Sequence, residues 1–206
     1  MPSPSMAGSI DGIVIGASAG GVEALTRLLP ALPRTMRASV FVVLHLPRER
    51  PSLLVDLFAP KCAVPVREAA DKELVEPGTV YFAPPDYHLL LDQGPQLALS
   101  VDELVNYSRP SIDVLFQSAA DVYGRRLLGI ILTGANEDGA SGLAAVRAAG
   151  GLTIVQRPDT AYSPQMALFA LQRTAVDHVL SLDEIADVFC TLTEDRANAC
   201  AGKELG

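Results

Sequence analysis

The chain has 206 residues, of which 49% are hydrophobic and 19% charged, and its formal net charge is −8. This composition is typical of one compact globular domain and excludes an intrinsically disordered chain. The acidic balance and the lack of a dense Lys/Arg cluster make nucleic acid and anionic membranes unexpected partners.

No apolar run approaches the roughly 20 residues that span a membrane, and the N-terminus lacks the apolar core of a signal peptide. We therefore expect a cytoplasmic protein without membrane insertion. The three cysteines, Cys62, Cys190 and Cys200, form no C-x-x-C pair, so we expect neither a disulfide framework nor a metal site. Residues 1–9 predict a disordered leader, residues 10–197 a single domain, and residues 198–206 a frayed tail.

Short β-branched runs alternate with segments of helical periodicity along the first half of the chain. Strands are expected over residues 10–16 and 38–44. Helices are expected over residues 21–29, with Pro30 as its stop, and over residues 52–58, with Ser52 as N-cap. Four short strands follow, broken by turn residues, and Asp92-Gln93-Gly94-Pro95 predicts a hairpin. These strands cover residues 64–66, 79–83, 88–91 and 96–101, and we expect them to form an antiparallel elaboration.

The alternation of helix and strand then resumes. Helices are predicted over residues 111–123, from about 140 to 149, 164–171 and 182–193, and strands over residues 127–132, 152–155 and 175–180. The resulting fold class is α/β: a three-layer, doubly wound, mostly parallel sheet with helices on both faces and an antiparallel β-hairpin in the middle of the chain. In such sheets, ligands bind beyond the carboxyl ends of the strands.

Three turns, each directly after a predicted strand, carry side chains that can take part in catalysis. Ser18 lies in a Gly-rich turn, His45 leaves the apolar run 38–44, and Asp138 lies in a Gly-flanked turn after the strand 127–132. These are the residue types of a hydrolytic triad: a hydroxyl that attacks, an imidazole that takes its proton, and a carboxylate that orients the imidazole. Backbone N–H groups of Ala19 and Gly20 are candidates for stabilising an oxyanion, and Ala135 is a further candidate for an oxyanion or substrate contact.

Each triad candidate also has a structural interpretation. Ser18 could cap the following helix, His45 could be a buried histidine bonded to the backbone, and Asp138 could be the N-cap of the helix after it. His88 and His178 compete for the role of base, and Glu137 competes with Asp138 for the role of acid. The placement of all three candidates at strand ends favours a site.

The turn at residues 16–20 matches G-x-S-x-G, but the order Ser, His, acid differs from that of α/β-hydrolases. It lacks the second glycine of a dinucleotide-binding turn and the Lys of a P-loop, which weakens any nucleotide interpretation.

The chain resembles the catalytic domain of the chemotaxis protein-glutamate methylesterases (CheB type) from about residue 10 to residue 188. The resemblance rests on ordered blocks at residues 15–21, 45–47, 83–88, 109–116, 131–134 and 138–140. It implies that Ser18 is the nucleophile, His45 the general base and Asp138 the third triad member, and that no cofactor is needed. It further implies hydrolysis of glutamate methyl esters on chemoreceptor helices, and deamidation of certain receptor glutamines.

This sequence departs from the family pattern at several positions. Ala19 stands where the family usually has Thr, Ala135 and Asn136 replace Met-Gly, and residues 165–168 replace a Met-Pro-Arg motif. Few residues precede the first predicted strand, so the usual phosphoreceiver domain is expected to be missing from this polypeptide. A separate response-regulator or chemosensory protein remains a possible partner. A non-catalytic binding module and a small-molecule serine esterase are the alternative functions.

Overall fold

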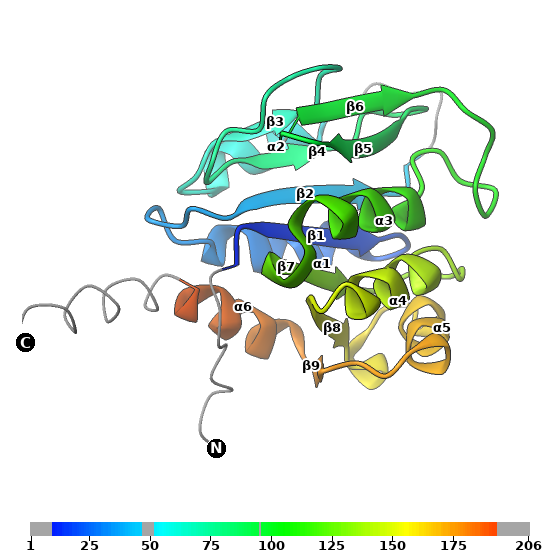
Figure 1. Cartoon of the computed structure of the whole chain (residues 1–206). Helices are drawn as coiled ribbons and strands as arrows, with labels where there is room; N and C mark the ends of the chain where they lie inside the picture. The colour runs from blue at the N-terminus through cyan, green and yellow to red at the C-terminus, as the bar shows by residue number, and fades with distance from the viewer. Residues whose placement is uncertain (1–9, 47–51, 95, 193–206) are drawn as a thin grey trace, which may run out of the picture.

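The computed structural model describes residues 10–46, 52–94 and 96–192. Within them, seven parallel strands form one sheet in the order β3-β4-β2-β1-β7-β8-β9 (Figure 1). The strands are β1 (Gly12–Ala17), β2 (Ser39–Leu44), β3 (Val66–Glu68), β4 (Val80–Phe82), β7 (Leu127–Ile131), β8 (Leu152–Gln156) and β9 (His178–Leu180). The predicted leader and tail lie outside the described residues.

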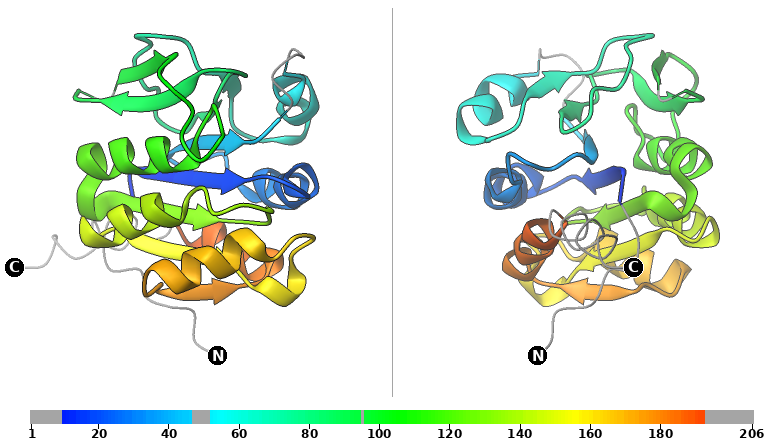
Figure 2. Two further views of the ribbon diagram at one scale, coloured as in Figure 1. Left: turned by 90° about the vertical axis from the view of Figure 1, so that its right-hand side faces the viewer. Right: turned by 60° about the vertical axis from the view of Figure 1, so that its left-hand side comes forward.

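Helices cover both faces of this sheet, one layer on each side (Figure 2). One face carries α1 (Gly21–Leu28), α2 (Leu54–Phe58) and α6 (Leu182–Thr191), and the other carries α3 (Ile112–Tyr123), α4 (Ala140–Ala148) and α5 (Gln165–Arg173). Single-turn 3₁₀ helices add η1 (Leu29–Ala31), η2 (Ala59–Lys61), η3 (Gly124–Arg126) and η4 (Pro158–Thr160). The predicted three-layer α/β architecture is confirmed.

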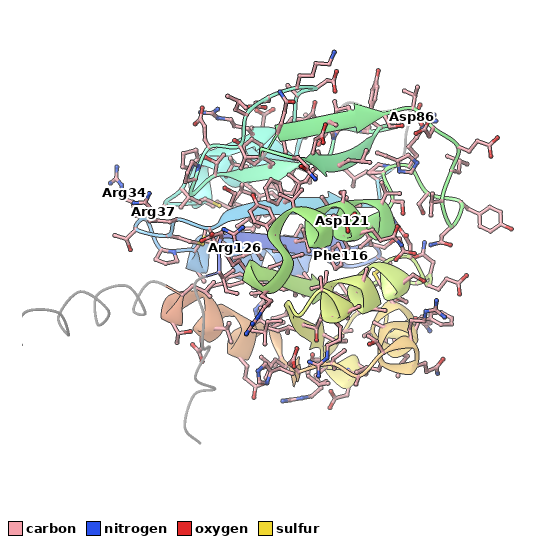
Figure 3. The ribbon with its side chains drawn as sticks, viewed as in Figure 1. Arg34, Arg37, Asp86, Phe116, Asp121 and Arg126 are labelled. Atoms are coloured by element: carbon pink, nitrogen blue, oxygen red, sulfur yellow. The ribbon has the colours of Figure 1, made fainter. Side chains whose placement is uncertain are left out.

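The central strands are apolar along their whole length because both of their faces are buried. In β1, Ile13 and Ile15 face the core under α1 and α6, whereas Val14 faces the core under α3. Phe116 of α3 is fully buried in that second core, between the helix layer and the sheet (Figure 3). A near-continuous apolar run is the pattern that a parallel sheet covered on both faces requires.

The middle of the chain differs in part from the prediction. β5 (His88–Asp92) and β6 (Gln96–Ser100) do pair antiparallel as a separate two-stranded sheet, which packs on α3. β3 and β4, however, are parallel members of the main sheet, so the expected antiparallel elaboration is wrong for them. Three-residue strands carry too short a pattern to reveal the direction of their partners.

Most predicted boundaries agree with the structure within a few residues. β9 begins three positions later than expected because the Asp177 carboxylate, rather than a strand backbone, accepts the hydrogen bond from the Thr153 amide at 2.9 Å. On α1, Leu25 and Leu28 are fully buried, whereas Val22 is 39% exposed. Ser181 caps α6 and forms a capping box with Glu184. Within the described residues, no helix is long and apolar enough to cross a membrane.

The topology switches direction at β1. The chain leaves β1 for β2 on one side, forms β3 at the edge and then β4 between β3 and β2, and later returns to β7 on the other side of β1. Loops that leave neighbouring strands on the two sides of such a switch diverge and leave room for a ligand. The loops after β1, β2 and β7 are those that carry Ser18, His45 and Asp138.

Candidate active site

The strand register brings Ser18 and His45 next to each other. Ala17 and Leu44 are register partners in the parallel ladder of β1 and β2, so the residues that follow them leave adjacent strands at the same level. The His45 amide donates to the Ala17 carbonyl at 3.1 Å, which extends the ladder by one step. Neighbouring strands are about 4.8 Å apart, so the two side chains start within reach of one another.

His45 and Asp138 form a direct hydrogen bond. The distance between His45 Nε2 and Asp138 Oδ2 is 2.9 Å, and the side chains are 13% and 0% exposed. A carboxylate only accepts hydrogen bonds, so Nε2 carries the proton and Nδ1 is the basic nitrogen of the neutral ring. His45 is therefore bonded to a carboxylate, and its interpretation as a buried histidine held by the backbone is wrong.

Asp138 is held by donors from the start of another helix. Its carboxylate accepts hydrogen bonds from the amide of Ile112 at 2.7 Å, the amide of Asp113 at 3.2 Å and the hydroxyl of Ser111 at 2.8 Å. These groups form the N-terminus of α3, where free amides and the helix dipole favour negative charge. The alternative that Asp138 caps α4 is wrong, because the N-cap of α4 is Gly139 and has no side-chain bond.

The charge of Asp138 follows from these contacts. Burial by itself raises the pKa of its carboxyl, but hydrogen bonds from His45 and Ile112 and the charge interaction with His45 outweigh burial. The net result is a pKa below the ordinary value for aspartate. Asp138 is thus an ionised acceptor at neutral pH, as a residue that orients an imidazole must be.

Ser18 lies at the start of a tight turn. Its own amide donates to the Thr133 carbonyl at 2.9 Å, and its carbonyl accepts the Gly21 amide at 2.8 Å. Within the described residues its hydroxyl makes no hydrogen bond, either to His45 or to the start of α1. The interpretation of Ser18 as a helix cap is wrong, since the N-cap of α1 is Gly20.

Two backbone N–H groups beside Ser18 are oriented by hydrogen bonds to the carbonyls of their own peptide units. The Ser18 carbonyl is bound by Gly21, and the Ala19 carbonyl is bound by the Thr133 hydroxyl at 2.8 Å. In a trans peptide the N–H points away from the carbonyl, so the N–H groups of Ala19 and Gly20 point to the opposite side. Neither N–H has a partner among the described residues, which leaves both available to bind an anion.

Gly20 is required for this turn. Its φ is +81°, and a Cβ at this position would lie 2.6 Å from Tyr162 Cβ. Both the left-handed backbone and the close approach favour glycine.

The predicted candidate Ala135 is exposed at the start of the loop that carries Asp138. The neighbouring Asn136 Oδ1 is buried without a hydrogen-bond partner in the described structure.

The rival residues take no part in this arrangement. His88 is buried; its Nδ1 accepts the Ser111 amide at 3.2 Å and its Nε2 lies 3.0 Å from the Glu103 carbonyl. His178 lies on β9, at the edge of the sheet and far in strand order from β1 and β2. Glu137 is exposed, whereas Asp138 is the residue bonded to His45.

Sequence reasoning missed several residues that support the site. Thr133 orients the Ala19 carbonyl, and Asn106 Nδ2 donates to Asp138 Oδ1 at 3.1 Å. Ser111 and Asp113 were visible only as parts of the block at residues 109–116. A Ser followed by an acidic residue at a helix start signals capping, but nothing local shows which distant carboxylate that helix start holds.

Surface hollows lie beside Asn106, which contacts Asp138, and at the opposite edge of the sheet. Asn106 lines two shallow hollows of about 630 and 340 Å³, the second of which also contacts Asp113. A separate cavity of about 580 Å³ at the amino ends of the strands is lined by Arg37, Asp121 and Arg126 (Figure 3) and contains none of the triad residues. This cavity and the triad therefore lie at different edges of the sheet. Among the described residues no cluster of three or more His, Cys, Asp or Glu side chains is arranged to hold a metal ion.

Comparison with known proteins agrees with this geometry. The sequence model described as CheB methylesterase matches residues 13–189. A putative protein-glutamate methylesterase/protein-glutamine glutaminase of Leptospira interrogans is 43% identical over 185 residues, which cover 90% of this chain and 96% of that protein. The protein-glutamate methylesterase/protein-glutamine glutaminase of Clostridium acetobutylicum is 34% identical over 179 residues, which cover 87% of this chain and 52% of that protein.

A solved structure shows the same fold. The crystal structure of the Thermotoga maritima CheB methylesterase catalytic domain matches with a TM-score of 0.84 and 32% sequence identity, covering 90% of this chain and all of that one. The chain thus spans nearly the whole length of the Leptospira protein but about half the length of the Clostridium one.

Proposed function

Because the chain belongs to the CheB methylesterase family, we propose that it removes methyl esters from glutamate side chains of chemoreceptors, with Ser18, His45 and Asp138 as its catalytic triad. The observation that carries this proposal is the 2.9 Å hydrogen bond between His45 and the buried Asp138. Ser18 and His45 directly follow register partners of the adjacent strands β1 and β2. Residues 10–197 form the catalytic domain, which acts in the cytoplasm on the receptors' cytoplasmic helices.

The first half of the reaction forms an acyl-enzyme. As Ser18 Oγ attacks the ester carbonyl carbon, His45 Nδ1 takes the hydroxyl proton, and Asp138 stabilises the resulting imidazolium through Nε2–H. The carbonyl oxygen becomes an oxyanion, which the N–H groups of Ala19 and Gly20 stabilise. When the tetrahedral intermediate collapses, Nδ1–H protonates the departing methoxide, and methanol leaves.

The second half restores the enzyme. Nδ1 removes a proton from water, whose oxygen attacks the acyl carbon, and the same two N–H groups stabilise the second oxyanion. Ser18 Oγ then leaves with the proton from Nδ1, and the receptor carries a free glutamate. With a glutamine side chain the same steps release ammonia instead of methanol, which gives deamidation.

The test compares Ser18→Ala with Ser141→Ala, a serine of α4 whose hydroxyl makes no hydrogen bond among the described residues. Methanol release from methylated receptor is measured for both variants, together with thermal unfolding. We expect Ser18→Ala to fold normally and release no methanol, and Ser141→Ala to behave as wild type. Methanol release by Ser18→Ala at the wild-type rate would overturn the assignment. A wild-type protein that hydrolyses small esters but never receptor would refute the proposed substrate.

A further inference from the structure

Two helices on the same face of the sheet exchange carboxylates at their N-termini. Asp138, just before α4, binds the first amides of α3, as described above. In return, Asp113 in the first turn of α3 accepts hydrogen bonds from the amides of Gly139 at 3.0 Å and Gly142 at 2.6 Å, at the start of α4. Each carboxylate satisfies helix-end donors that have no partner within their own helix.

This exchange brings two buried carboxylates close together. Asp113 is 6% exposed and Asp138 0%. Burial raises the pKa of Asp113, the Gly142 amide lowers it, and the nearby charge of Asp138 raises it again, with a net rise. Two carboxylates that share a buried site repel one another, and protonation of one is the usual outcome. Because the pKa of Asp113 is raised and that of Asp138 is lowered, such a proton belongs to Asp113, and the resulting O–H would compete with His45 for the Asp138 carboxylate.

The side-chain amide of Asn106 lies between the two acids. Its Nδ2 is 2.9 Å from Asp113 Oδ2 and 3.1 Å from Asp138 Oδ1, so its two N–H bonds serve one carboxylate each. An amide that donates to both acids lowers the free energy of the doubly charged state relative to a singly protonated one.

A tight turn presents Asn106 to this position. The amides and carbonyls of Val105 and Ser108 bond to each other at 3.2 and 2.9 Å, and the two residues between them have positive φ, +50° at Asn106 and +60° at Tyr107. This is the backbone of a type I′ turn, for which Asn and Gly are favoured.

The segment that carries the turn is fixed at both ends. Arg109 forms an ion pair with Asp86 at 2.8 Å, at the site edge of the sheet (Figure 3). Its Nη1 donates to the carbonyls of Val101 and Asp102. The backbone of the turn is therefore held by contacts that do not involve the triad.

We propose that Asn106 is a positioning residue for the methylesterase reaction: its amide bridges Asp113 and Asp138, keeps both carboxylates charged side by side, and so keeps Asp138 available to hold His45. The inference rests on the proposed triad. It adds a residue that touches neither substrate nor the reacting atoms and acts through Asp138.

The first variant is Asn106→Gly, because glycine adopts the positive φ of the turn and only the amide is lost. We expect kcat for methanol release to fall by about ten- to a hundredfold, since a small displacement of a catalytic group has effects of that size. KM should stay within about twofold, because the side-chain N–H groups of Asn106 are bonded to the two carboxylates. Asn106→Asp retains the turn and adds a third carboxylate, so we expect a larger loss than for Asn106→Gly; this second variant decides the question if the first fails to fold.

The decisive comparison is between the turnover of the double variant Asn106→Gly/Asp113→Asn and that of Asn106→Gly alone. Removing the charge of Asp113 removes the repulsion that Asn106 relieved, while the carbonyl of the new side-chain amide still accepts the Gly139 and Gly142 amides. We expect the double variant to turn over at least about threefold faster than Asn106→Gly alone, a non-additive effect typical of groups in one network. A purely structural role of Asn106 predicts the opposite, that the second substitution adds to the loss.

The outcomes separate this inference from the proposed function. A wild-type kcat for Asn106→Gly, or a double variant no faster than the single one, overturns the inference while an inactive Ser18→Ala still supports the triad. An active Ser18→Ala overturns the triad whatever the Asn106 variants show.

Discussion

Thr133 links the turn that carries Ser18 to the loop that carries Asp138, and its replacement by valine tests how the oxyanion donors are oriented. The Thr133 hydroxyl donates to the Ala19 carbonyl at 2.8 Å and accepts the Ser163 amide at 2.9 Å. Thr133→Val preserves the shape of this buried side chain and removes both bonds. Without its anchor, the peptide between Ala19 and Gly20 is free to rotate, so the Gly20 N–H no longer has a fixed direction.

The expected size of the effect follows from these two bonds. Loss of an oxyanion donor lowers kcat by about 10²–10³-fold. Because Gly20 N–H is only released and not removed, we expect Thr133→Val to lower kcat by about 10–100-fold with little change in KM. The free energy of unfolding should fall by about 1–3 kcal/mol, since the Ser163 amide is left without its acceptor in a partly buried place.

Thr153→Val is the matched control. Thr153 is fully buried, and its hydroxyl donates to the Asp177 carboxylate at 2.8 Å and accepts the Asp177 amide at 3.0 Å, at the far end of β8 from the site. Both variants should lose similar stability in urea unfolding, but only Thr133→Val should lose kcat for methanol release. If the two variants turn over equally fast, the proposed orientation of the Gly20 N–H is wrong.

Three further changes have defined outcomes. Gly20→Ala should lower kcat and reduce stability by about 1–3 kcal/mol, because of its positive φ and the contact with Tyr162; unchanged melting and kcat would contradict this. His88→Leu should lower stability through the lost Ser111 bond yet retain methanol release, and complete loss of release in a folded variant would contradict the assignment of His88 to a structural role. Asp138→Asn should be inactive. Folding lowers the pKa of Asp138, so its charge stabilises the native state above about pH 5, and this contribution is lost as the pH falls through the lowered pKa. The stability gap between wild type and Asp138→Asn in urea should therefore shrink from pH 7 to pH 3; a gap that is constant or grows would contradict the lowered pKa.

The strands that place the triad could be predicted from the sequence because they carry strong local patterns. The runs that became β1, β2 and β7 are continuous, apolar and β-branched, and the rule that parallel strands end at one edge then brings Ser18, His45 and Asp138 together. The directions of β3 and β4 could not be predicted in the same way, because three residues hold almost no pattern.

The residues that support the triad were beyond sequence reasoning for another reason. Asn106 bonds to Asp138, 32 positions later, and Thr133 bonds to the Ala19 carbonyl, 114 positions earlier. Such contacts depend on how loops from different strands meet, and side-chain types alone do not specify them. The local preference of Asp138 for capping the next helix was a reasonable expectation, but the tertiary arrangement directs its carboxylate to α3 instead.

The central claim is that Ser18 is activated by His45, and covalent labelling tests it most directly. A fluorophosphonate reacts with a serine whose hydroxyl has a base to take its proton, and peptide mass spectrometry locates the adduct. We predict one adduct per chain, on Ser18, and labelling at least about a hundredfold slower in His45→Ala, the usual size of a general-base contribution. An adduct on another residue, no adduct on folded protein, or labelling of His45→Ala at the wild-type rate would contradict the account.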